Sequence, residues 1–327
     1  MSKKNFHNWV NKYFYSPNFW QKFIAKLLLP LSYIYAFIVI IKKILSKEKD
    51  LNIKIISVGN LIVGGSGKTP LTLALYKYFS KNYKTLIILR GYKRSSKGLV
   101  EVCIDNKILV DVKQSGDEAM EYALNNANVI VSENRINAIQ KAKSLGANLI
   151  ILDDGFSKFN IKKFNILLKP PIRPYFNFVL PSGAYRYPLF FYKFGNFIIE
   201  NNENKKYSFI ENETKNMVLV TAIANPNRLK EHFNKCIEKE FFPDHHAFTK
   251  DELSQIIEKY NATSILVTMK DYVKIKDFDL PISIIRLEIS LSQTLIKAIS
   301  NYIKQEYDKI KNKFLKEKKN GNFASII

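Results

Sequence analysis

Short apolar runs alternate with mixed, amphipathic stretches along most of the chain. In the first half, strongly apolar runs predict buried strands at 53–58, 85–89, 129–131, 148–152 and 165–168. The mixed stretches between them predict helices at 70–80, 119–125 and 133–145. Strands that alternate with helices in this way are typical of a parallel, doubly wound α/β sheet.

A second α/β series follows a break in this pattern. Prolines mark irregular chain between 170 and 188, and the polar residues 197–216 predict a linker or crossing strands. We then expect strands at 217–221, 264–268 and 283–287, and helices at 227–238, 250–259 and 293–306. The predicted parts are a first α/β domain at 49–196, a linker at 197–216, a second, smaller αβα domain at 217–308 and a basic tail at 309–327.

Residues 1–48 differ from the rest of the chain. An apolar run at 27–41 is interrupted by Pro30, lysines lie on both sides of it, and the two tryptophans, Trp9 and Trp20, precede it. The run is shorter than the ~20 residues that a membrane span needs, and it lies too far from Met1 for a signal peptide. The segment is therefore predicted to form a helix that lies in a membrane interface. A buried core helix and a single span are the alternatives.

Charge points to an anionic partner. The 327 residues include 51 Lys and Arg against 29 Asp and Glu, a net charge of +22. Such a charge favours a membrane surface, a nucleic acid or a phosphorylated substrate. The lysines are dispersed and the aromatic residues gather at the N-terminus, which disfavours a nucleic-acid-binding module. Two cysteines without zinc-site spacing indicate a reducing, cytoplasmic compartment, and nothing in the sequence indicates an obligate protein partner.

A glycine-rich turn between the first predicted strand and helix is typical of a phosphate-binding loop. Glycines let backbone N–H groups turn toward phosphate, and the helix N-terminus adds a favourable dipole. The lysine of the loop would reach the β- and γ-phosphates of ATP, and its threonine would bind Mg²⁺. Ile62 stands where the strict P-loop pattern has its first glycine. The loop residues are Gly64, Gly65, Ser66, Gly67, Lys68 and Thr69.

Two aspartates support this interpretation. Asp153 and Asp154 follow the apolar run 148–152, and the carboxyl ends of parallel strands form the ligand-binding edge of a sheet. One of them is expected to hold the Mg²⁺ shell. Two further clusters, Gly116-Asp117-Glu118 and Asp244-His245-His246, could supply an acid–histidine pair that activates a hydroxyl group. An acidic first helix turn is the simpler explanation of the first cluster.

These motifs, in this order, resemble the tetraacyldisaccharide 4′-kinase family of lipid A biosynthesis. The resemblance runs from about residue 25 to 275, and the Leu29–Tyr35 stretch fits it too. The matching strings are Val58-Gly59-Asn60, Gly64 to Pro70, Arg90-Gly91-Tyr92, Gly116-Asp117-Glu118, Asp153-Asp154-Gly155-Phe156, Leu180-Pro181-Ser182-Gly183 with Arg186, Pro243-Asp244-His245, and Thr268 with Lys270-Asp271.

The resemblance implies a lipid kinase with a P-loop NTPase-like fold. Such an enzyme transfers the γ-phosphate of Mg·ATP to the 4′-hydroxyl of tetraacyldisaccharide 1-phosphate, giving lipid IVA. It also implies a cleft between two αβα domains and peripheral attachment to the cytoplasmic face of the bacterial inner membrane. The partners would then be the acylated disaccharide phospholipid and the anionic membrane surface.

The resemblance also assigns roles to single residues. Asp117 would take the proton of the sugar hydroxyl and His245 would orient Asp117. Lys68 joins them in catalysis. Mg²⁺ would be held by Thr69, Asp153 and Glu118. The substrate-binding residues would be Arg90, Arg135, Asp154 and Arg186.

This chain departs from the family pattern at several positions. Ser157-Lys158 replaces a usual Gln-His pair, and the other departures are Leu89, Ala119, Tyr187 and Met269. These departures are expected to affect contacts with the lipid headgroup more than phosphoryl transfer. A membrane-associated P-loop ATPase and a lipid-binding relative with weak catalysis are the alternative functions. Met269-Lys270-Asp271 lacks the asparagine of a guanine-specific string, which disfavours GTP.

Overall fold

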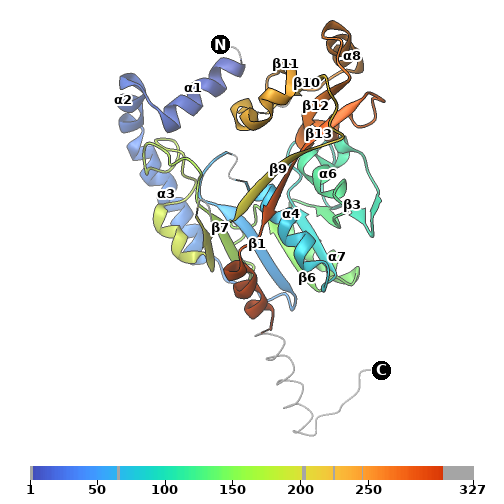
Figure 1. Ribbon diagram of the computed structural model, residues 1–327. Coiled ribbons are helices and arrows are strands. Elements are labelled where there is room, and N and C mark those ends of the chain that lie inside the picture. Colours follow the sequence, from blue (N-terminus) through green and yellow to red (C-terminus); the bar gives the residue numbers. More distant parts are fainter. Residues whose placement is uncertain (1–2, 65–66, 201–203, 224, 245, 305–327) are drawn as a thin grey trace, which may run out of the picture.

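Two β-sheets form the framework of the molecule (Figure 1). The structure is a computed structural model that describes residues 3–64, 67–200, 204–223, 225–244 and 246–304. The first sheet is parallel except at its β4–β3 edge. Its spatial order is β4 (Lys107–Ile108), β3 (Val100–Ile104), β5 (Val129–Val131), β2 (Thr85–Leu89), β6 (Leu149–Asp153), β1 (Lys54–Asn60), β7 (Phe164–Leu168) and β8 (Phe197–Ile199).

The second sheet has five strands, and only β9 runs antiparallel to its neighbour. β8 and β9 both lie within residues 197–216, so this segment supplies one edge strand to each sheet. The boundaries of the two domains remain a prediction from the sequence. The spatial order is β11 (Cys236–Phe241), β10 (Met217–Thr221), β12 (Ser264–Thr268), β13 (Ile282–Ser290) and β9 (Lys205–Glu211).

Helices pack on the sheets and also form the N-terminal part of the chain, and residues 293–304 form a further helix near its C-terminal end. The helices are α1 (Lys3–Tyr15), α2 (Phe19–Leu27), α3 (Leu29–Leu45), α4 (Lys68–Phe79), α5 (Val112–Ser115), α6 (Asp117–Ala123), α7 (Arg135–Ser144), α8 (Lys250–Lys259) and α9 (Met269–Ile275), with 3-10 turns η1 (Leu189–Phe194) and η2 (Pro226–Lys235).

The predicted helix at 227–238 is wrong. Residues 226–235 form the 3-10 segment η2, and Cys236–Phe241 pairs with β10 as a strand. The local sequence is rich in helix-forming Lys and Glu, but pairing with a fully buried neighbouring strand outweighs that weak preference.

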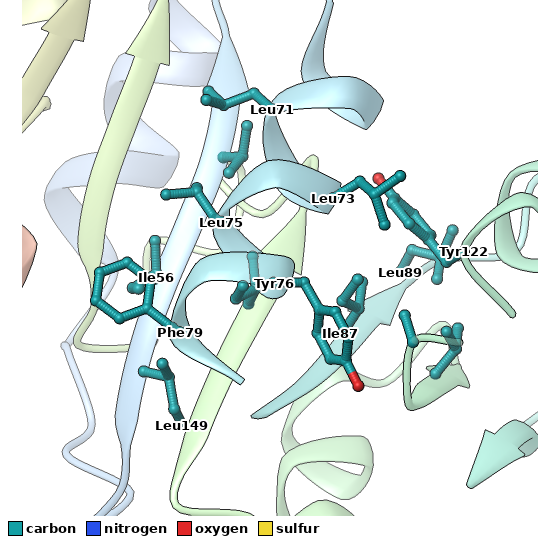
Figure 2. Packing of buried hydrophobic residues seen from close by; sticks show 14 of the residues in the cluster. Ile56, Leu71, Leu73, Leu75, Tyr76, Phe79, Ile87, Leu89, Tyr122 and Leu149 are labelled. Atoms are coloured by element: carbon teal, nitrogen blue, oxygen red, sulfur yellow. The ribbon is translucent and has the colours of Figure 1, made fainter. Parts of the chain in front are cut away.

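The core follows from the alternation of side chains along the central strands. Ile56 of β1 packs beneath α4, whereas its neighbour Ile55 packs with α7 on the opposite face. Leu71, Leu75 and Phe79 of α4 recur every four residues, so one face of the helix covers the sheet (Figure 2). α4 is thereby held rigidly at the end of β1.

The C-terminal helix returns to the first sheet. Its residues Leu295, Ile299 and Ile303 are buried in the same cluster as Ile56. The Tyr302 hydroxyl also donates a hydrogen bond to the Ile55 carbonyl oxygen at 3.2 Å. The chain therefore passes from the first sheet to the second between β8 and β9, and it returns to the first sheet after β13 (Figure 1). These two crossings connect the two sheets.

α3 packs on the first sheet by one face only. Tyr35, Ala36, Val39 and Ile40 lie against a cluster of aromatic residues, and the hydroxyl of the buried Ser32 donates to the Val179 carbonyl oxygen at 2.9 Å. The opposite face exposes an apolar stripe made of Ile34, Phe37, Ile38, Ile41, Ile44 and Leu45.

α1 and α2 continue this N-terminal layer. Gln21 donates to the Trp9 carbonyl oxygen, and the Tyr13 hydroxyl donates to that of Pro181. Trp20 and Phe23 are among the exposed apolar side chains of α2. Among the described helices, none alone has the length and apolar character to cross a bilayer; α2 and α3 reach that threshold only as a pair, which is bent by 52°.

Ile299→Ala is expected to lower the free energy of unfolding by about 2–5 kcal/mol, because it leaves a cavity under the first sheet. Urea unfolding followed by circular dichroism measures this loss. Asn301→Ala, at an exposed position of the same helix, should change the stability by less than about 0.5 kcal/mol. Equal effects of the two variants would contradict the packing of this helix.

Candidate active site

The glycine-rich loop connects the buried end of β1 to the first turn of α4. Gly64 and Gly67 have φ values of +97° and +84°, a region that residues with a Cβ adopt only with strain. Lys68 and Thr69 open α4, so both side chains start at the helix N-terminus. Gly65 and Ser66 lie outside the described residues.

A neighbouring segment fixes the backbone of this loop. The Val63 N–H donates to the Ala184 carbonyl oxygen at 2.9 Å, and the Arg186 N–H donates to that of Leu61 at 2.7 Å. The loop and the Arg186 side chain are therefore placed by the same short ladder of hydrogen bonds.

Asp154 brings two cations together at the carboxyl edge of the sheet. Arg186 donates to both of its carboxylate oxygens at 3.1 Å, and Lys68 Nζ lies 3.7 Å from Oδ1. A third Arg186 contact, to Asn60 Oδ1 at 2.5 Å, links this group to the end of β1. The Asp154 side chain is 46% exposed, but the surrounding protein desolvates its carboxylate and opposes its charge; Lys68 and Arg186 outweigh this effect and lower its pKa.

Asp153 lies deeper than Asp154. It is 3% exposed, and its Oδ2 accepts a hydrogen bond from the fully buried Tyr122 hydroxyl at 2.8 Å. Its Oδ1 is buried and has no hydrogen-bond partner among the described residues. Burial and the adjacent Asp154 raise the pKa of Asp153, against the opposing effect of Lys68.

This oxygen suits a magnesium ion. Mg²⁺ prefers oxygen ligands and is commonly bound through one or two carboxylates together with phosphates and water. Asp153 Oδ1 is a carboxylate oxygen with unused accepting capacity. The residues present at this edge therefore fit Mg²⁺.

Two glutamates of α6 face the same region. Solvent reaches the Glu118 side chain, but the surrounding protein desolvates its carboxyl group, and together with Asp153 this raises its pKa to about 7. Burial and Glu118 raise the pKa of Glu121 to about 7 as well. Glu118 interacts electrostatically with both Asp153 and Lys68, so it belongs to the same charge cluster.

Asp117 is the first residue of α6 and is half-buried. Its predicted partner, His245, lies outside the described residues. The pairing of the two remains a prediction. The flanking residues Asp244 and His246 are held by Lys270 and Glu252 at 3.3 and 2.8 Å.

Arg135 and Arg90 form a separate, basic part of the site. Arg135 is 4% exposed, donates to the Ser132 carbonyl oxygen, and has a buried Nε without a hydrogen-bond partner among the described residues. Burial lowers its pKa to about 10. Arg90 is exposed after β2, and its charge also lowers the pKa of Lys158, after the effects of burial and Arg135. A surface cavity of about 370 Å³ is lined by Arg135 and Lys158 among others.

Sequence reasoning missed Tyr122 and Glu121. Tyr122 reaches Asp153 across a sequence separation of 31 residues, and no local pattern indicates such a contact. Glu121 could have been predicted from the sequence, because it lies three residues after Glu118 and therefore on the same face of a helix.

Comparisons with known proteins identify the family of this chain. The family model described as tetraacyldisaccharide-1-P 4′-kinase, LpxK, matches residues 24–304. This chain belongs to the tetraacyldisaccharide-1-P 4′-kinase family. The resemblance seen in its motifs is thereby confirmed.

Relatives in this family align along almost the whole chain. The tetraacyldisaccharide 4′-kinase of Campylobacter jejuni serotype O:2 is 50% identical over 306 residues, which cover 93% of this chain and 98% of the relative. The enzyme of that name from Aliarcobacter butzleri is 46% identical over 312 residues, 92% of this chain and 98% of the relative.

A solved structure confirms the fold class. The "apo" form of LpxK from Aquifex aeolicus, crystallised in complex with ATP, superposes with a TM-score of 0.73 at 25% identity. The match covers 86% of this chain and 99% of the Aquifex chain. The expected α/β architecture with a parallel sheet is therefore correct.

Glu121→Gln is expected to stabilise the protein at pH 8 and to have little effect at pH 5. The pKa of Glu121 is raised from 4.5 to about 7, so its ionised form destabilises the fold once the pH rises through this interval. Removing the charge should add about 1–3 kcal/mol at pH 8. Urea unfolding at both pH values measures the difference.

Glu258→Gln provides the control, because Glu258 is exposed on α8. Its effect on stability should be small, as is usual for a surface substitution. An equal change at pH 5 and pH 8 for Glu121→Gln would contradict the desolvation of its carboxyl group.

Proposed function

We propose that this chain transfers the γ-phosphate of Mg·ATP to the 4′-hydroxyl of tetraacyldisaccharide 1-phosphate, giving lipid IVA. The observation that carries the proposal is the convergence of Lys68, Arg186 and the two aspartates at one edge of the sheet, in a chain of this family. Phosphoryl transfer depends mainly on positioning and on neutralising charge. Two cations and a cluster of carboxylates beside a helix N-terminus meet both needs.

Each residue has a distinct task in this proposal. Lys68 neutralises charge on the β- and γ-phosphates, and Arg186, with its planar fork of donors, holds a phosphate oxygen in place. Thr69, Asp153 and Glu118 would hold Mg²⁺. The ion, when bound, offsets the charge of the β- and γ-phosphates. Asp154 keeps Lys68 and Arg186 in place while negative charge develops on the leaving ADP.

Asp117 acts as the general base. As the sugar oxygen forms its bond to the γ-phosphorus, its proton passes to the Asp117 carboxylate and the bond to the ADP oxygen breaks. His245 would orient Asp117. Arg90 and Arg135 lie in the basic part of the site and would bind anionic groups of the lipid.

Asp117→Asn is expected to lower kcat by about 10²–10⁴-fold with little change in the KM for ATP, because it removes the proton acceptor and leaves the loop intact. The assay follows label from γ-labelled ATP into detergent-dispersed tetraacyldisaccharide 1-phosphate by thin-layer chromatography. Asp279→Asn is the matched control, since Asp279 is exposed with a φ of +54° that asparagine tolerates.

The outcomes separate this function from its alternatives. Hydrolysis of ATP without labelled lipid would indicate a membrane-associated ATPase. Binding of the lipid without either activity would indicate a lipid-binding relative. Normal transfer by Asp117→Asn would contradict the role of this residue.

We also propose that the enzyme lies on the cytoplasmic face of the inner membrane through its N-terminal helices. The apolar stripe of α3 is exposed, and Phe37 within it is 63% exposed. Trp9 and Trp20 add amphipathic rings of the kind that favour the headgroup region, and a net charge of +22 favours anionic lipid. A substrate with four acyl chains remains in the bilayer, so the enzyme has to meet it there.

Phe37→Glu is expected to weaken binding to anionic vesicles at least about tenfold. The substitution removes apolar area that would be buried in the membrane and adds a negative charge that anionic lipid repels. Vesicle sedimentation at low and moderate salt measures the affinity. Ile108→Glu, at an exposed position on the far edge strand β4, should bind as the unaltered protein does. Equal binding by Phe37→Glu would exclude the stripe as the membrane surface.

A further inference from the structure

Thr268, Lys270 and Asp271 take no part in the mechanism above, yet they lie where the two sheets meet. These residues begin α9, which follows β12 of the second sheet. α9 packs against α6, the helix that begins with Asp117 and packs on the first sheet. Any side chain in this contact can affect how the two parts of the site are placed.

Asp271 fixes α9 in the second half of the molecule. It is fully buried and accepts hydrogen bonds from the Thr221 and Thr268 hydroxyls at 2.7 and 2.8 Å. The Thr268 hydroxyl also caps the helix by accepting from the Asp271 N–H. The start of α9 is thereby joined to the end of β10, and Lys270 extends from a rigid position.

Lys270 faces carboxylates from two different parts of the chain. Its Nζ lies 3.3 Å from Asp244 Oδ1, just before the predicted catalytic histidine. Its charge also acts on Glu118 and Glu121 of α6, where it opposes the rise of their pKa values. Arg286 faces Glu121 too, but its guanidinium is already paired with Glu211 at 2.5 Å.

The segment around Asp244 is held to α9 and α8 at a second point. Lys274 Nζ of α9 donates to the His246 carbonyl oxygen at 3.3 Å, and the His246 ring lies 2.8 Å from Glu252 of α8. Asp244 and His246 are therefore both held by residues of α8 and α9, and α9 in turn packs against α6. His245 itself lies outside the described residues.

We propose that Lys270 is a positioning residue whose ammonium group pairs with Asp244 at the contact of α9 with α6 and so holds Asp244 at a fixed separation from Asp117. The inference rests on the proposed function for the roles of Asp117 and His245. Without this cation, Asp244 would lose its ion pair at 3.3 Å, and the carboxyl groups of α6 would lose a compensating charge. The separation of the two halves would then be less well fixed.

Lys270→Met tests the proposal kinetically. It is expected to lower kcat for lipid phosphorylation by about 10–100-fold, because a small misplacement of catalytic groups is enough for such a loss. The KM for ATP should stay within about threefold, since the ion pair of Lys270 is with Asp244 and not with a residue of the loop. Lys270→Arg keeps the cation and should restore most of the rate.

Lys276→Met is the matched control. Lys276 caps the other end of α9 and pairs with its neighbour Asp277 at 2.7 Å, so its removal should leave kcat unchanged. Asp244→Asn in the Lys270→Met background should cost less than the product of the two single effects. Multiplicative losses, unchanged kcat in Lys270→Met, or a rise in the KM for ATP alone would overturn the proposal.

A distance measurement is independent of catalysis. Spin labels at Lys81→Cys and Asp251→Cys, both exposed, in a Cys236→Ser background report the separation of the two halves by pulsed EPR. Lys270→Met should lengthen or broaden this distance, and Lys276→Met should not. If no lipid is labelled by the unaltered chain, the proposed function fails, and the EPR result alone decides the role of Lys270: an unchanged distance overturns it.

Discussion

Asp154 accepts two hydrogen bonds from Arg186 while Lys68 lies 3.7 Å away, and the whole site depends on this one carboxylate. It joins the end of β6, the first turn of α4 and the chain at 184–186. The Asp154 side chain is 46% exposed, and the surrounding protein partly desolvates its carboxylate, which the two cations compensate. Here that compensation also places the two cations where a polyphosphate would need them.

The same segment links the site to the N-terminal layer. Ser32 of α3 donates to Val179 and lies 2.8 Å from Ser182, and Ala184 then accepts from Val63 of the loop. Gly183 tolerates no side chain here, because a Cβ would lie 2.2 Å from the Phe178 carbonyl oxygen. A continuous, close-packed path therefore connects the proposed membrane surface to the phosphate-binding loop.

The sequence predicted the central strands closely. β2, β5, β10 and β12 begin and end where the apolar runs do, because a fully buried parallel strand needs an uninterrupted apolar run. The glycine-rich loop and the paired aspartates were also recognisable, since their chemistry depends on local spacing.

What could not be predicted depends on distant parts of the chain. β11 forms because β10 offers a buried partner, and its local composition favours a helix. The return of residues 293–304 to the first sheet has no local signal either. Tyr122 against Asp153 and Lys270 against α6 arise from tertiary placement alone.

Arg186→Lys tests the central claim most directly, because it keeps the positive charge and removes the fork that bonds Asp154 and Asn60 together. The measurement is the rate of lipid phosphorylation, with the affinity for Mg·ATP by calorimetry. If this fork organises the phosphate site, the rate should fall by about 10–100-fold and ATP should bind more weakly. A rate and affinity equal to those of the unaltered protein would show that net charge alone suffices and would contradict this account.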